Sequence, residues 1–157
     1  MKGITKNELS KECWWPLGYS QKPHGIVLAD LNHVRDSIVS EVDKEQKKII
    51  SLNPVLVKDT PHYQYALGNK APYEEYLNKC KHITWARAGI NEEHLEIQYM
   101  FDKFDAILNS DKLYLDPPFE NKYIIVADNG LLIDGLHRAV ALLSSGIDKA
   151  PIALVRN

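Results

Sequence analysis

The stretch that decides the fold runs from Tyr123 to Val155 and reads Y-I-I-V-A-D-N-G-L-L-I-D-G-L-H-R-A-V-A-L-L-S-S-G-I-D-K-A-P-I-A-L-V. Asn129-Gly130 lies between two apolar runs and predicts a two-residue hairpin with positive φ. Gly135 then lets the backbone turn sharply, and the alanine- and leucine-rich run 139–143 favours a helix that stops at Gly146. Pro151 to Val155 reads as a closing strand. The segment is therefore a hairpin, a turn, a helix and a strand.

The turn itself, Asp134-Gly135-Leu136-His137-Arg138, is called the corner below. His137 and Arg138 are predicted at or just before a helix N-terminus, where unpaired N–H groups and the helix dipole attract anions. Arg138 is suited to clamp phosphate oxygens, His137 to donate a hydrogen bond or shuttle a proton, and Asp134 to hold a metal or orient the histidine. This combination predicts phosphoryl recognition.

An ordinary structural interpretation of the same residues stays open. Asp134 is a favoured residue for capping the helix, and Arg138 would then lie on a solvated face and pair with Asp148 or Glu120. Each residue alone fits that interpretation well. The four residue types together, within five positions after a hairpin, favour a site.

The run Ile133 to Arg138, followed by an Ala/Leu-rich helix, Gly146 and a closing strand, resembles the signature of the ParB/sulfiredoxin superfamily. Its members carry Gly-Cys-His-Arg in sulfiredoxin, a Glu-Arg-Arg version in chromosome-partitioning proteins and Asp-Gly-His-His-Arg in the free serine kinases. The present Asp-Gly-Leu-His-Arg is most similar to the last. The resemblance covers residues 123–155 and is weaker upstream.

Departures from the pattern narrow what the resemblance implies. Sulfiredoxin needs a cysteine directly before His-Arg, where this chain has Leu136, and Cys13 and Cys80 are far away in sequence. Partitioning proteins continue into a helix-turn-helix domain, whereas this chain ends at Asn157. The resemblance therefore implies a stand-alone nucleotide-using domain like the serine kinases, with Asp134, His137 and Arg138 around the transferred phosphate. The resemblance also implies a site for ATP or ADP, formed by Gly135, His137, Arg138 and Ala139. Asp134 would hold the Mg²⁺ ion that accompanies the nucleotide.

Composition predicts a single domain over residues 1–157 and excludes several classes of protein. The formal charge of −2 has both signs interspersed, which argues against nucleic acid because nonspecific binding needs a concentrated basic surface. No apolar run approaches a membrane span and the N-terminus lacks a signal, so we expect a cytoplasmic protein without a membrane partner. The two cysteines have no CxxC spacing and predict reduced thiols.

Upstream of the deciding stretch, the pattern predicts a mixed α/β domain, with a small partly open sheet that carries helices. Residues Gly25 to Asp30 read as a short strand. Leu31 to Ile50 read as a helix, because Val34, Ile38 and Val42 recur at i, i+4 spacing. Pro54 to Val57 read as a buried strand.

The segment from Asp59 to Tyr76 is dense in groups able to hydrogen-bond a polar ligand and is predicted to be a loop. Loops that follow a buried strand often carry specificity residues. Asp59 or His62 would take the proton of an acceptor hydroxyl, as the early-strand acid or base does in the superfamily. Tyr63, Tyr65 and Tyr73 would contact the substrate, and the alternative is that these tyrosines are half-buried packing residues.

Residues Asn91 to Asn109 predict an amphipathic helix with a stripe at Ile97, Phe101, Phe104 and Leu108. Residues 59–121 exceed what a minimal superfamily domain needs between its strands, and we interpret them as an inserted helical cap over the pocket.

These observations favour a phosphotransferase that uses ATP or ADP and acts on a small hydroxylated or amine-bearing metabolite. Two alternatives stay open. One is a nucleotide-binding or interaction module without turnover, and the other is a ParB-like nuclease or DNA-binding protein.

Overall fold

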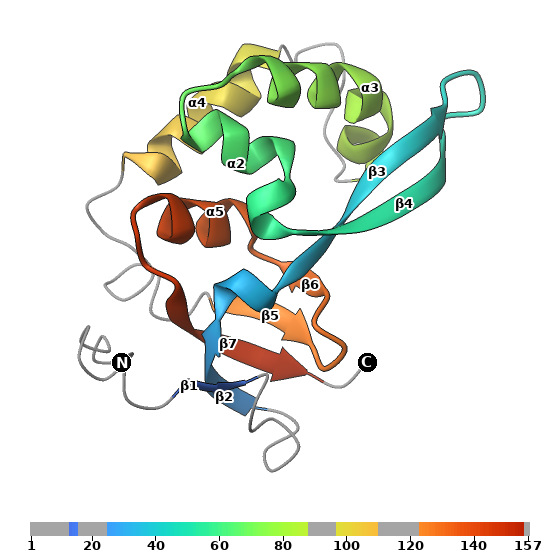
Figure 1. Cartoon of the computed structure of the whole chain (residues 1–157). Helices are drawn as coiled ribbons and strands as arrows, with labels where there is room; N and C mark the ends of the chain where they lie inside the picture. The colour runs from blue at the N-terminus through green and yellow to red at the C-terminus, as the bar shows by residue number, and fades with distance from the viewer. Residues whose placement is uncertain (1–12, 16–24, 88–96, 110–122, 156–157) are drawn as a thin grey trace.

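The computed structural model describes residues 13–15, 25–87, 97–109 and 123–155. The fold is mixed α+β. A five-stranded sheet has the order β1-β2-β7-β5-β6, and a separate two-stranded sheet pairs β3 with β4. Figure 1 shows helix α5 between the large sheet and a group of three helices, α2, α3 and α4.

The deciding stretch folds largely as its sequence predicts. It forms strands β5 (Ile124–Ala127) and β6 (Leu132–Asp134), helix α5 (Leu136–Ser144) and strand β7 (Lys149–Val155). β5 pairs antiparallel with β6 and parallel with β7. β7 in turn pairs antiparallel with β2 (Gly25–Asp30), the predicted first strand, and the short β1 (Cys13–Trp15) runs parallel to β2.

The β5–β6 turn differs from the predicted two-residue hairpin. Gly130 N–H donates to the Ala127 carbonyl (2.9 Å) and Ala127 N–H donates to the Leu131 carbonyl (2.8 Å), which makes a three-residue loop. Only Gly130 of the loop has a positive φ (88°), so Asn129 does not take the left-handed position. A type I turn followed by a left-handed glycine has this form, and it also suits the twist of a hairpin.

The helix predicted for Leu31 to Ile50 is wrong. Residues Leu31–His33 form a single 3₁₀ turn (η2), and β3 (Arg35–Asp43) and β4 (Lys48–Leu56) form an antiparallel hairpin. A spacing of four places residues on one face of a helix and equally on one face of a strand, because four is a multiple of two. The β-branched residues of this region decide for strands. Asp43 shapes the hairpin turn by accepting from the Glu45 and Gln46 N–H groups, both at 3.0 Å.

The buried strand predicted for Pro54 to Val57 is only partly correct. Pro54 and Leu56 lie in β4 and are exposed, while Val57 begins a second 3₁₀ turn, η3 (Val57–Asp59), and is fully buried. β4 has no strand on its outer side within the described residues. Such an edge tolerates the missing N–H of proline.

The loop predicted for Asp59 to Tyr76 is wrong as well. It contains α2 (Pro61–Ala66) and the start of α3 (Ala71–Arg87). Thr60 caps α2 by accepting from the Tyr63 N–H (3.2 Å), and Pro61 occupies the first helical turn. A threonine cap followed by proline is a helix start signal that the density of polar side chains obscured.

Helix α4 (Ile97–Leu108) confirms the described part of the predicted amphipathic helix, while residues 91–96 lie outside the described residues. Phe101 and Phe104 face the core, as the stripe predicts. The described parts of 59–121 are thus mainly helical. None of the described helices is long and apolar enough to cross a membrane.

The core joins the two halves of the molecule through α5. One side of α5 meets the sheet and the other meets the helices. The buried residues from these parts form one cluster, and its largest fully buried members are Tyr73, Phe104, Leu31, Ile124, Leu142, Ile152 and Leu154.

Candidate functional site

The corner connects β6 to α5 through Gly135, which adopts a left-handed conformation (φ 104°, ψ 26°). Gly135 occupies the cap position, and no side chain caps the helix. The capping role considered for Asp134 is therefore not observed. Because an α-helix leaves its first N–H groups without intrahelical partners, the start of α5 offers donors to a ligand.

A glycine is required at this position for a second reason. A Cβ built on Gly135 would lie 3.2 Å from the Arg138 guanidinium and 3.2 Å from both the Cα and the Cγ1 of Ile124. The close approach of β5 to the corner and the position of Arg138 both depend on the missing side chain.

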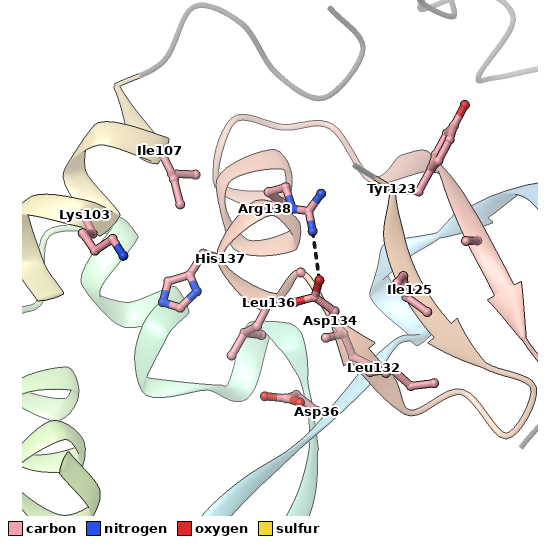
Figure 2. Close-up of a pocket in the computed structure, with 13 residues that line it drawn as sticks. Asp36, Lys103, Ile107, Tyr123, Ile125, Leu132, Asp134, Leu136, His137 and Arg138 are labelled. Carbon is pink, nitrogen blue, oxygen red and sulfur yellow. Dashed lines mark ion pairs between the residues drawn. The ribbon is translucent and has the colours of Figure 1, made fainter. Parts of the chain in front are cut away.

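A pocket of about 1080 Å³ opens beside the corner (Figure 2). Its walls come from β3, α4, β5, β6, the start of α5 and β7. Two cations, two carboxylates and one imidazole line it together with apolar side chains: Asp36, Lys103, Ile107, Tyr123, Ile125, Leu132, Ile133, Asp134, Gly135, Leu136, His137, Arg138 and Ala153. A volume of this size is at the upper end for small-molecule sites.

Asp134 and Arg138 face each other across the corner. The Asp134 carboxylate lies 3.5 Å from the Arg138 guanidinium, and the exposed fractions of the two side chains are 69% and 16%. Arg138 therefore pairs with Asp134 within the corner, and Glu120, one of the two alternative partners considered above, lies outside the described residues. The pKa of Arg138 is lowered by burial, and the Asp134 charge opposes that shift. The arginine stays charged, since its ordinary pKa is so high.

His137 points away from this ion pair and toward the helices (Figure 2). Its ring meets Phe104 edge-on at 4.7 Å and His62 edge-on at 5.4 Å between ring centroids. Burial lowers the pKa of His137 to about 4, with further lowering from Lys103 and Arg138 and an opposing effect of Asp134. The imidazole is thus neutral at pH 7, and the positive charge of the site comes from Arg138 and Lys103.

Two charged residues of the pocket, Asp36 and Lys103, were not among the site residues predicted from the sequence. Asp36 belongs to β3, whose start is tied to the β5–β6 turn by a hydrogen bond from the Arg35 N–H to the Gly130 carbonyl (3.0 Å). Burial raises the pKa of Asp36, although a backbone hydrogen bond from Ser37 opposes this. Asp36 was hidden because its segment was interpreted as a helix. Lys103 was hidden because the sequence of α4 singles out its apolar stripe, to which Lys103 does not belong.

The remaining predicted residues lie elsewhere. Asp59 is exposed in η3 and does not line the pocket. His62 is buried on α2 against His137. Tyr73 is fully buried, and Tyr65 is stacked on Phe101 and Phe104.

The positions of these tyrosines thus fit the interpretation as half-buried packing residues better than the interpretation as substrate-contacting residues. The Tyr65 hydroxyl donates to the Asp105 carboxylate of α4 (2.7 Å), and Asp105 does not line the corner pocket. Tyr63 is partly buried against the core. Ala139, expected to bind nucleotide, is fully buried, and its N–H donates to the Gly135 carbonyl (2.9 Å). Its backbone donor is thus used inside α5.

The carboxylates of the pocket fit Mg²⁺ only together with a phosphate ligand. The described residues contain no group of three or more His, Cys, Asp or Glu side chains able to hold a metal ion. Mg²⁺ is usually bound by one or two carboxylates, with substrate phosphates and water completing its octahedron. Asp134 has the exposure that such a role requires.

In comparisons with known proteins, no family model, no curated protein and no solved structure matches this chain.

Proposed function

We propose that the protein is a nucleotide-dependent phosphotransferase, a kinase that uses ATP or ADP and acts on a small metabolite with a hydroxyl or amine group. The observation that carries this proposal is the lining of the corner pocket. The start of α5, Arg138 from that helix and Lys103 from α4 all contribute to it. Phosphoryl transfer needs charge neutralisation and positioning more than it needs covalent chemistry, and these groups supply both.

The phosphates would bind at the start of α5. Gly135 allows the backbone close approach there, and Arg138 is largely shielded from solvent, so its interaction with a phosphate is weakly screened. Asp134 already pairs with Arg138 at 3.5 Å. On our proposal a phosphate replaces the carboxylate as partner of Arg138, and Asp134 becomes available to hold Mg²⁺. The ion would neutralise charge on the phosphates.

Asp36 is the candidate base. It lines the pocket from β3, and its pKa is raised by burial. A raised pKa makes a carboxylate a better proton acceptor. In the transfer, the acceptor oxygen bonds to the terminal phosphorus, the bond to the bridging oxygen breaks toward the leaving nucleotide, and the acceptor proton passes to Asp36. Asp36 thereby takes the role expected of Asp59 or His62.

His137 contributes a neutral imidazole beside the two cations. In this state it can donate one hydrogen bond and accept another. Binding of an anionic phosphate would raise its pKa, because opposite charge favours the protonated ring. It is thus suited to take up a proton when the nucleotide binds.

The test is a thermal-shift and calorimetric titration of ATP, ADP, CTP and GTP, with and without Mg²⁺. We expect one nucleotide to stabilise the protein, since a ligand that binds only the folded state raises its stability. Arg138→Ala should weaken that nucleotide roughly 10- to 100-fold, as hydrogen bonds to charged groups are worth about 1.5–3 kcal/mol. Lys58→Ala, an exposed residue of η3 outside the pocket, is the matched control.

Each outcome discriminates between functions. The absence of a shift with every nucleotide would refute the kinase. Nucleotide binding without transfer to any of a set of hydroxylated or amine-bearing metabolites would favour the module without turnover. Retention on heparin at moderate salt would favour nucleic acid instead.

A further inference from the structure

His62 has a buried nitrogen that nothing in the described protein satisfies. Its side chain is 6% exposed, and its Nδ1 atom is buried without a hydrogen-bond partner. An unpaired buried polar atom costs about 1–3 kcal/mol, and such groups in folded proteins call for an explanation. A phenylalanine at this place would pack equally and avoid that cost.

The ring of His62 lies at the centre of an aromatic cluster. It contacts Tyr73 at 4.7 Å, Tyr76 at 5.3 Å, Phe104 at 6.3 Å and His137 at 5.4 Å between centroids. Of these neighbours only His137 lines the corner pocket. The contact of His62 with His137 is edge-on, at an interplanar angle of 80°. Edge-on contacts place the positive edge of one ring on the negative face of the other and thus depend on ring orientation.

The position of His62 is fixed from the N-terminal end of α2. Thr60 is fully buried, donates its hydroxyl to the Val57 carbonyl (2.7 Å) and accepts from the Tyr63 N–H (3.2 Å). His62 follows two residues later, in the first turn. The ring is thus held by the cap as well as by its neighbours.

A second orphaned group lies beside the first. The Tyr73 hydroxyl is also buried without a partner, and its ring is the nearest to His62. A hydroxyl is a donor, and the lone pair of a neutral imidazole is an acceptor, so the two groups are complementary.

We infer that His62 is a positioning residue for His137, and that its polar ring edge holds the His137 imidazole in one orientation and one neutral tautomer beside the corner. The inference rests on the proposed function only in the role of His137, which is to take up a proton when nucleotide binds. The charged groups around His137 are Lys103 from α4, Asp134 from β6 and Arg138 from α5. Burial holds both histidines neutral, so the contact is between two uncharged rings.

The test is the tautomer of His137 in the intact chain, measured from imidazole ¹⁵N shifts between pH 5 and pH 8. The His137 signals are assigned by their loss in His137→Gln. In the wild type we expect a single neutral tautomer over this range. In His62→Phe, which keeps an aromatic ring but removes the polar edge, we expect shifts intermediate between the two tautomers.

Phe104→Leu is the matched control, because Phe104 touches His137 more closely than His62 does but only through packing. It should leave the single tautomer in place. The inference is overturned if His62→Phe keeps the wild-type shifts, or if Phe104→Leu disturbs them equally. It is also overturned, with no variant needed, if wild-type His137 shows both tautomers at pH 7. None of these results depends on nucleotide binding, so the inference and the proposed function can fail separately.

Discussion

Single residues set the chemistry of the corner through what surrounds them. His137 and Arg138 are neighbours in sequence, yet one is held neutral by burial and the other stays charged. As successive residues of α5 they point in different directions, Arg138 toward Asp134 and His137 toward α2 and α4 (Figure 2). The corner thus contains a charged half, formed by Arg138 with Asp134, and an uncharged half, formed by His137.

Gly135→Ala should destabilise the protein by more than backbone strain alone. A left-handed conformation costs a residue with a Cβ about 1–2 kcal/mol, and here the new methyl group also meets Ile124 and Arg138. Gly68→Ala is the control, since Gly68 has a similar φ (95°) with nothing within 4 Å of its Cβ position. Urea unfolding of both variants should show the larger loss for Gly135→Ala. Equal losses would contradict the close approach at the corner.

Buried His62 and half-buried His137 predict a loss of stability in acid. The folded pKa values of His62 and His137, about 3 and about 4, lie below the ordinary value of 6.5. The unfolded chain therefore binds protons that the folded chain does not, and stability falls as the pH drops below about 6.5. For His62 alone the loss is roughly 3 kcal/mol by pH 4.

Unfolding measured from pH 7 to pH 4 checks this prediction. His62→Phe should flatten the dependence on pH, whereas His33→Asn, a change at an exposed histidine, should leave it intact. A wild-type stability that does not change over this range would contradict the burial of both rings.

At the scale of elements, short helices and strands bring the site together from distant parts of the sequence. Asp36 enters the pocket from β3 and Lys103 from α4, while His62 of α2 packs against the ring of His137. The β3–β4 hairpin is fastened to α3 by hydrogen bonds from the Val39 N–H to the Tyr76 hydroxyl (3.3 Å) and from Lys79 to the Ser40 carbonyl (3.4 Å). These contacts tie the carboxylate side of the pocket to the helices.

Thr60→Ala tests the support given by α2. Loss of an N-cap costs about 0.5–2 kcal/mol, and we expect the upper half of that range because the Thr60 hydroxyl is fully buried and uses both a donor and an acceptor. Thr60→Ser keeps the hydroxyl and should recover most of the loss. Thermal unfolding of the two variants measures the difference, and equal melting temperatures would show that the cap contributes little.

At the scale of the whole molecule, the pocket combines charges that the fold would not bury for stability alone. Asp36 has a raised pKa because burial disfavours its charged form, and this carboxylate therefore destabilises the folded state near neutral pH. Carboxylates of this kind gather at functional sites.

Asp36→Asn should therefore raise the unfolding temperature at pH 7 while it abolishes phosphoryl transfer. On the proposed function nucleotide affinity should persist, because the phosphates would bind at the start of α5 and not at Asp36. Asp102→Asn, on the exposed part of α4, is the control for removal of a carboxylate. A variant that is both less stable and fully active would contradict the role assigned to Asp36.

The sequence by itself determined the hairpin, the corner, α5 and β7, because residues 123–155 carry local signals that agree: a turn glycine, a helix-forming run and a terminating glycine. It also determined the buried stripe of α4. Only the tertiary structure decided that Leu31 to Ile50 form strands, since a spacing of four suits both periods and pairing of β3 with β4 resolves it. The tertiary structure likewise decided the site. Asp36 and Lys103 line the pocket, and His62 packs against His137, yet all three are separated from the corner by dozens of residues. No local pattern specifies which distant side chains gather there.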